Sequence, residues 1–270
     1  MPETGLIRGA SLTKEKLLNK SNRSSRKSEW KGGRANTVLY SRAYNLVFAH
    51  YPKTGGSSIR TWFHETFADD LIDHEPDIPH HHVRKGLARL RCGPRPPSSP
   101  LLRLLCQCSK PMNSPYRVPH DVRVLGVLRE PFDLLRSLFL YWRRTASPGT
   151  KSPFIRSAVT ADFTKFVWLA TARRRLPNYH RFFGVGTKVW QRTTLVDFSN
   201  LKAGLQDAMR RLAVPTAVQL PSVNANPAHR HTPASRGELL TFDTRMGMAV
   251  RQHFAWYYDE GRSLCLRGSC

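Results

Sequence analysis

A group of residues able to hold an anion lies in the segment HYPKTGGSSIR, residues 50–60 of this 270-residue chain. One lysine, two adjacent glycines and three hydroxyl side chains follow one another there: Lys53, Thr54, Gly55, Gly56, Ser57 and Ser58. Backbone N–H groups of such a loop can converge on a phosphate or sulfate, and glycine lets the backbone approach it closely. The loop taken alone would also fit a simple Gly-Gly turn capped by Ser57.

The order of these residues separates the loop from the phosphate loop of nucleotide kinases. That motif is G-x-x-x-x-G-K-[ST], in which the lysine follows the glycines and the hydroxyl binds magnesium. Here Lys53 precedes the glycines, and no acidic residue at a strand end offers an evident metal ligand. We therefore expect Lys53 to lie beside the bridging oxygen of a phosphate anhydride, and we expect no metal.

A second segment, LREPFDLLRSLF, places Arg129 and Ser137 eight residues apart. Arg129 directly follows an apolar run of strand length, residues 122–128, which puts it at the edge where parallel α/β sheets bind ligands. Ser137 falls two turns into the next expected helix, whose buried stripe includes Leu135 and Leu138. A purely structural role explains these leucines but does not explain Arg129.

The elements that must position these residues alternate between strands and helices. We expect strands at 44–49, 122–128 and 189–196, and helices from 57, from about 82, from 131, near 161–171, 201–212 and 243–258. This alternation predicts an α/β domain built on a mostly parallel sheet. The chain has 40% hydrophobic residues and no internal repeat, which fits a single folded core.

The first and last expected elements set the boundaries of the expected domain. Residues 1–43 are basic and Ser-rich, which predicts a flexible arm or an organelle transit peptide. Residues 44–270 would form one domain with an irregular Pro-, Arg- and Ser-rich insertion at about 91–119. No run of about 18 apolar residues occurs. We therefore expect no membrane span and a soluble cytoplasmic or organellar protein, with a lumenal location left open.

Charge and cysteine content bear on partners and compartment. The chain has 43 Lys and Arg against 19 Asp and Glu, a formal net charge of +24. Such an excess favours partners that carry phosphate, sulfate or carboxylate groups, although part of it is ordinary solvated surface.

Five cysteines are too few for a disulfide scaffold, and Cys106 and Cys108 lack a second pair for zinc. Cys265 and Cys270 could pair in an oxidising compartment.

The two motifs together resemble those of sulfotransferases that use 3′-phosphoadenosine 5′-phosphosulfate (PAPS). The likeness is greatest to the carbohydrate type related to heparan sulfate 2-O-sulfotransferases and to its bacterial and algal relatives. HYPKTGGSSIR is similar to the 5′-phosphosulfate loop, H-x-P-K-T-G-G-T/S-S, and VLGVLREPFDLLRSLF to the 3′-phosphate motif, F-x-x-V-R-x-P-x-x-R-x-x-S. Weaker likeness, as in TTLVDFSNLKAGL, extends the resemblance over about 44–260, but the insertion at 91–119 departs from the usual pattern.

This resemblance implies a P-loop-kinase-like, three-layer α/β domain that takes PAPS as donor and needs no metal. The loop from Lys53 to Ser58 would hold the 5′-phosphosulfate, with Lys53 neutralising charge on the bridging oxygen. Arg129 and Ser137 would hold the 3′-phosphate. The implied reaction is in-line transfer of a sulfuryl group to an acceptor hydroxyl, with carbohydrate as the expected acceptor.

The acceptor hydroxyl must lose its proton to a base, and a neutral imidazole suits that task near neutral pH. Among eleven histidines we select His81, with His82 as the nearest alternative, because HHVRKGL matches the family pattern H-x-x-x-[KR]-x-[LI]. His64 and the neighbouring Glu65 are the rival candidates.

Several alternatives stay open at the level of sequence. The acceptor could be an acidic glycan, a small natural product with a hydroxyl or amine, or a protein tyrosine. A different class of function is a non-catalytic protein that keeps the fold and binds polyanions or nucleic acid, although we expect no specific nucleic-acid partner. In the family a late basic loop covers the nucleotide, for which Arg230 and Arg236 are candidates.

Overall fold

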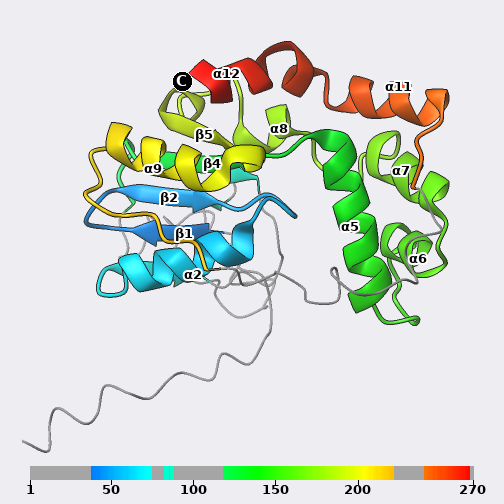
Figure 1. Ribbon diagram of the computed structural model, residues 1–270, viewed down its shortest axis with the longest axis horizontal. Coiled ribbons are helices and arrows are strands. Elements are labelled where there is room, and N and C mark those ends of the chain that lie inside the picture. The colour runs from blue at the N-terminus through cyan, green and yellow to red at the C-terminus, as the bar shows by residue number, and fades with distance from the viewer. Residues whose placement is uncertain (1–37, 75–81, 85, 88–117, 222–239, 268–270) are drawn as a thin grey trace, which may run out of the picture. The chain divides into compact units, whose positions relative to one another are not determined.

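The computed structural model describes residues 38–74, 82–84, 86–87, 118–221 and 240–267 (Figure 1). These residues belong to one compact unit that spans Ala35–Cys270. His81, Arg230, Arg236 and residues 91–117 of the expected insertion lie outside the described residues. Within the described part of the chain, no helix is long and apolar enough to cross a membrane.

The described residues form a five-stranded mixed sheet at the centre of the unit, so the expectation of an α/β fold is confirmed. The strands lie in the order β3 (Leu71–His74), β1 (Val38–Ser41), β2 (Leu46–Ala49), β4 (Arg123–Leu128) and β5 (Thr193–Asp197). β2, β4 and β5 are parallel to one another, whereas β1 is antiparallel to both β2 and β3. The sheet is therefore less parallel than the sequence pattern indicated.

The first strand corrects the expected domain boundary. We assigned residues 1–43 to a flexible arm, but Val38–Ser41 forms a strand between β2 and β3. Leu39 is 1% exposed, and the buried hydroxyl of Ser41 donates a hydrogen bond to Asp70 Oδ2 at 2.7 Å. Four residues are too short a run to show a period in the sequence, and only the neighbouring strands make them recognisable as a strand.

Helices follow most of the strands, and their first turns carry the expected signals. The described helices are α2 (Gly56–Thr66), α5 (Pro131–Thr145), α6 (Pro153–Val159), α7 (Phe163–Thr171), α8 (Tyr179–Phe183), α9 (Leu201–Arg211), α11 (Thr244–His253) and α12 (Arg262–Arg267). Pro131 occupies the first turn of α5, and Glu130 caps that helix by accepting a hydrogen bond from the N–H of Asp133. Asn178 caps α8 in the same manner.

Side chains that alternate along the strands divide the core between the two faces of the sheet. One face packs with residues of α2 and α9 through Leu39, Leu46, Phe48, Leu125, Val127 and Val196. The opposite face packs with residues of α5, α7, α8 and α11 through Tyr40, Val47, Ala49, Val124 and Leu195. Helices therefore cover both faces, and α5, α6, α7 and α11 lie together (Figure 1).

The connections that leave β2 and β4 run to opposite sides. The chain passes from β2 through α2 to β3, at one end of the strand order, and from β4 through α5 to α8 to β5, at the other end. In open α/β sheets a ligand crevice forms where two such connections diverge at the carboxyl ends of neighbouring parallel strands. The two sequence motifs occupy these two strand ends.

Candidate anion-binding site

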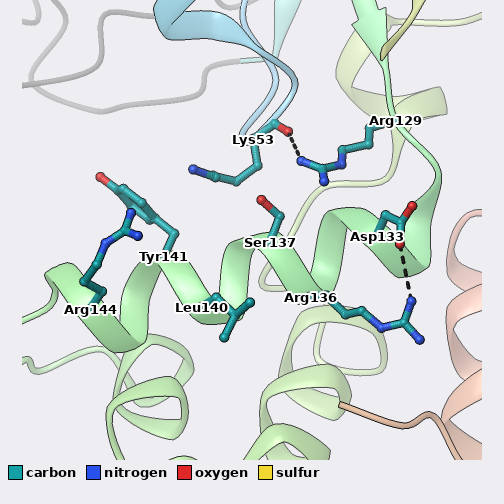
Figure 2. A pocket seen from close by; sticks show the side chains of 8 residues that line it. All are labelled: Lys53, Arg129, Asp133, Arg136, Ser137, Leu140, Tyr141 and Arg144. Carbon is teal, nitrogen blue, oxygen red and sulfur yellow. Dashed lines mark hydrogen bonds and ion pairs between the residues drawn. The ribbon is translucent and has the colours of Figure 1, made fainter. Parts of the chain in front are cut away.

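A pocket of about 250 Å³ lies between the loop after β2, the end of β4 and one face of α5 (Figure 2). It is lined by Lys53, Arg129, Asp133, Arg136, Ser137, Leu140, Tyr141 and Arg144. Four of these side chains are cationic and one is a carboxylate. Three of the residues selected from the sequence, Lys53, Arg129 and Ser137, thus lie in one pocket although they come from separate parts of the chain.

The loop after β2 has an unusual backbone that turns Lys53 towards the pocket. Lys53 has φ 60° and Gly55 has φ 78°, both in the left-handed region. That region is unfavourable for lysine, so the surrounding contacts must hold it. One such contact is internal: the buried Thr54 hydroxyl donates to the carbonyl oxygen of Tyr51 at 2.8 Å. The Thr54 hydroxyl therefore closes the turn, and the part that Thr54 would play in holding a ligand is left to its backbone N–H.

The structure requires glycine at positions 55 and 56 for different reasons. Gly55 is the residue before α2 and adopts the left-handed conformation. Gly56 begins α2, and a Cβ atom built on it would lie 1.8 Å from Nε2 of His50. The helix start has no side-chain cap, so the expected alternative of a turn capped by Ser57 is wrong. Neither Ser57 nor Ser58 lines the pocket, and their predicted contact with a ligand stays a prediction.

Arg129 connects the two loops. Its Nη1 donates a hydrogen bond to the carbonyl oxygen of Lys53 at 3.0 Å, across 76 positions of sequence. Its guanidinium lies over the ring of Phe198, with Cζ 4.5 Å from the ring centroid. The guanidinium therefore fixes the strained Lys53 backbone while it also lines the pocket.

The wall of the pocket is the polar face of α5. Asp133, Ser137 and Tyr141 follow one another at i, i+4 and i+8 on this face, and Arg136 and Arg144 flank them. The sequence predicts only Ser137 on this helix as a site residue, although the helical spacing from Ser137 also indicates the others. Arg136 is held in place by hydrogen bonds from Nε to the carbonyl oxygen of Leu240, at 3.1 Å, and from Nη1 to Asp133, at 3.3 Å.

Electrostatics indicate that the pocket favours an anion. Burial lowers the pKa of Lys53, and the neighbouring Arg144 and Arg129 lower it further. Burial likewise lowers the pKa of Arg129, although Asp133, Tyr179 and Glu130 oppose this shift. The Lys53 ammonium lies 4.3 Å from the ring centroid of Tyr141, which partly compensates for lost hydration. A bound anion would relieve the repulsion among these cations.

The candidate bases that the structure describes are His82, His64 and Glu65, and they lie outside this pocket. His82 is half-buried, and its Nδ1 lies 3.0 Å from the carbonyl oxygen of Arg181, so Nδ1 carries the proton. His64 and Glu65 are exposed on α2. None of these three side chains lines the pocket, so the choice of base stays a prediction.

Comparisons with protein-family models, with curated proteins and with solved structures gave no match to this chain. Among the residues described, no group of three or more His, Cys, Asp or Glu side chains is arranged to hold a metal ion. The proposed function therefore rests on the geometry of the pocket and on the two sequence motifs.

Proposed function

We propose that the protein is a sulfotransferase that moves a sulfuryl group from PAPS to an acceptor hydroxyl, with a carbohydrate as the first candidate acceptor. The observation that carries this proposal is the convergence of Lys53, Arg129 and Ser137 on one cationic pocket. A donor with a 3′-phosphate and a 5′-phosphosulfate needs two groups of cations and hydroxyls close together. The neighbouring Arg136 and Arg144 add to the charge available for such a ligand.

We further propose that the fold is a P-loop-kinase-like, three-layer domain. Two features support this proposal: helices pack on both faces of the sheet, and β2 leads through a glycine loop directly into α2. The start of α2 would then contribute its unpaired N–H groups to the 5′-phosphosulfate. This arrangement suits a phosphate ligand without the nucleotide-kinase order of residues.

In the proposed reaction the acceptor oxygen attacks sulfur as the bond between sulfur and the bridging oxygen breaks. The product nucleotide, 3′-phosphoadenosine 5′-phosphate (PAP), leaves with the electron pair of that bond, and the base takes the acceptor proton. Lys53 would stabilise the charge that develops on the bridging oxygen. Arg129 and Ser137 would hold the 3′-phosphate and so keep the three reacting atoms in line. His81 is the proposed base, with His82 as alternative.

The decisive experiment compares the binding of two nucleotides by calorimetry. The wild-type protein should bind PAP more tightly than adenosine 5′-phosphate, because only PAP carries a 3′-phosphate. The substitution Arg129→Ala should weaken PAP binding by about 1.5–3 kcal/mol, the range for a charge-assisted hydrogen bond. It should change the binding of adenosine 5′-phosphate much less.

A matched control is Arg143→Ala, since Arg143 is an exposed arginine of α5, the helix that forms the pocket wall, but does not itself line the pocket. Equal losses for both nucleotides in Arg129→Ala would contradict the assignment of the 3′-phosphate site. The wild-type protein could bind PAP and yet transfer no sulfuryl group to any hydroxyl acceptor. That result would favour the alternative of a non-catalytic polyanion-binding protein, which the net charge of +24 also supports.

A further inference from the structure

The pocket depends on a buried tyrosine that does not line it. The hydroxyl of Tyr179, the first residue of α8, donates a hydrogen bond to the carbonyl oxygen of Arg129 at 2.7 Å. The same hydroxyl accepts a hydrogen bond from the backbone N–H of Arg129 at 3.2 Å. One side chain thus binds both polar groups of the Arg129 backbone.

This double contact replaces the pairing that the sheet cannot supply. The pairing between β4 and β5 ends at Leu128, which lies opposite Asp197. Arg129 is the next residue, so its N–H and carbonyl groups need other partners. A hydroxyl can donate and accept at once. Tyr179 therefore supplies the backbone hydrogen bonds of Arg129, one residue beyond the end of the strand.

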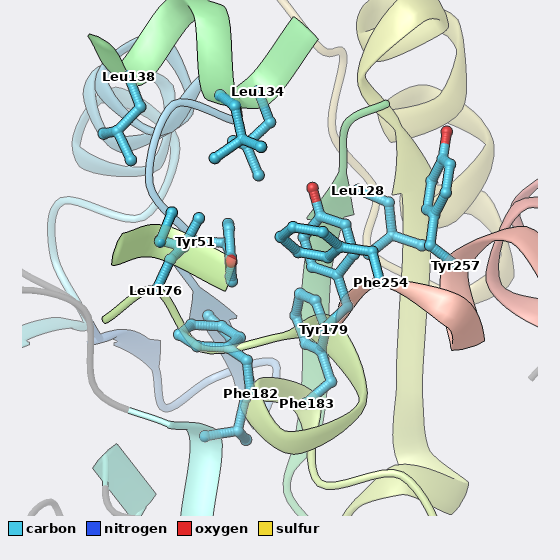
Figure 3. Packing of buried hydrophobic residues seen from close by; sticks show 14 of the residues in the cluster. Tyr51, Leu128, Leu134, Leu138, Leu176, Tyr179, Phe182, Phe183, Phe254 and Tyr257 are labelled. Carbon is cyan, nitrogen blue, oxygen red and sulfur yellow. The ribbon is translucent and has the colours of Figure 1, made fainter. Parts of the chain in front are cut away.

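Tyr179 is itself held rigidly. It is 1% exposed, and its ring packs with those of Tyr51, at 4.6 Å between centroids, and Phe254, at 5.2 Å (Figure 3). Burial raises the pKa of the Tyr179 hydroxyl well above its ordinary value. The hydroxyl consequently stays protonated at physiological pH and keeps its role as donor.

The second loop of the pocket is tied to the same short segment. Tyr51, two residues before Lys53, donates a hydrogen bond from its hydroxyl to the carbonyl oxygen of Pro177. Pro177 in turn lies two residues before Tyr179. Arg129 and the Lys53 loop therefore have a common support, besides the direct bond from Arg129 to the Lys53 carbonyl oxygen.

We infer that Tyr179 is a positioning residue that fixes the Arg129 guanidinium and so sets the preference of the pocket for nucleotides with a 3′-phosphate. This inference rests on the proposed function for the identity of the ligand. The role of Tyr51 is parallel but distinct, because Tyr51 supports the loop proposed to hold the 5′ group.

The test uses Tyr179→Phe, which keeps the ring and removes only the hydroxyl. The affinity for PAP should fall about tenfold, as expected for the loss of two buried hydrogen bonds, while the affinity for adenosine 5′-phosphate should change less than about twofold. Tyr51→Phe should weaken the binding of both nucleotides to a similar degree. Tyr257→Phe is the packing control, because Tyr257 is also buried and its ring lies 5.8 Å from that of Tyr179.

A double-mutant cycle separates positioning from general destabilisation. In the Arg129→Ala background, Tyr179→Phe should have no further effect on PAP affinity, since the residue that it positions is gone. An equal loss in both backgrounds, or no loss in the wild-type background, would overturn the inference.

If the wild-type protein binds neither nucleotide, the proposed function fails, and the same cycle is measured with inorganic pyrophosphate as the probe. Tyr179→Phe should then weaken pyrophosphate binding only when Arg129 is present. Absence of this dependence, including absence of any pyrophosphate binding to the wild-type protein, would overturn the positioning role as well.

Discussion

The two faces of α5 carry out separate tasks within one helix of 15 residues. One face buries Leu134, Leu135, Leu138 and Phe139, each at most 3% exposed. The other face presents Arg136, Ser137, Tyr141 and Arg144 to the pocket. The apolar face determines where the pocket wall lies, and the polar face determines what the pocket can bind. Substitutions on the two faces should therefore affect different measurements.

The largest effect is expected on the buried face. Phe139 packs against Phe163 and Phe166, with centroids at 5.0 and 5.3 Å, and Phe139→Ala should lower the free energy of unfolding by about 3–5 kcal/mol. Denaturant titration measures this loss. The folded fraction should still bind PAP with unchanged affinity. Leu140→Ala is the control, because the neighbouring Leu140 is 36% exposed and its loss should change stability by less than about 0.5 kcal/mol.

On the pocket side, Lys53→Ala should lower the rate of sulfuryl transfer about 100- to 1000-fold, as is typical for the loss of one contact to a developing charge. The denaturation midpoint should hardly change, because Lys53 is not part of either core cluster. Lys53→Arg keeps the charge and should retain more of the rate than Lys53→Ala does. Wild-type turnover in Lys53→Ala would end the catalytic role proposed for this lysine.

A smaller effect should reveal the contact between Lys53 and Tyr141. The ring favours the protonated amine by about 0.5–1 kcal/mol, so Tyr141→Leu should lower the pKa of Lys53 further. Tyr141→Phe keeps the ring and should leave this pKa nearly unchanged. The pH dependence of amine acylation at Lys53 measures the shift, and identical behaviour of the two variants would exclude a role for the ring.

The smallest effect at neutral pH concerns the protonation of Lys53 in the free protein. Because its pKa is lowered from the ordinary value of 10.5, the amine loses its proton at a lower pH than an exposed lysine does. A bound anion favours the protonated form, so PAP affinity should be highest below the lowered pKa and fall as the pH rises through it. Lys53→Arg should abolish this fall below pH 10.5. A wild-type affinity that stays constant up to pH 10.5 would contradict the assignment.

The sequence predicted the parts of the fold that have long periodic patterns or strong local signals. The helix stripe after Pro131 and the strand before Arg129 were located within one or two residues. β1, β3 and α8 were missed, because each has at most five residues and is defined by its neighbours in space.

The candidate site likewise has residues that the sequence predicts and residues that only the structure reveals. Lys53, Arg129 and Ser137 were selected from the sequence because each stands at a fixed offset from a strand end. The spacing along α5 could also have identified Tyr141 and Arg144. Nothing in the sequence around Tyr179 indicates its bond to Arg129, because that contact joins residues 50 positions apart and depends on the packing of α8.

The close approach of Gly56 to His50 has a consequence for how this loop can vary among related chains. Any side chain at position 56 would occupy the space of the imidazole ring at position 50. The two positions should therefore vary together, with a small residue at 50 wherever 56 is not glycine. Gly56→Ala should force the His50 ring out of its position and weaken PAP binding, and His50→Ala should restore PAP binding in the double variant. Position 55 is under an additional constraint, because its backbone angle is left-handed and a Cβ atom built there would also lie 2.8 Å from Leu201 and 3.3 Å from the Phe198 ring.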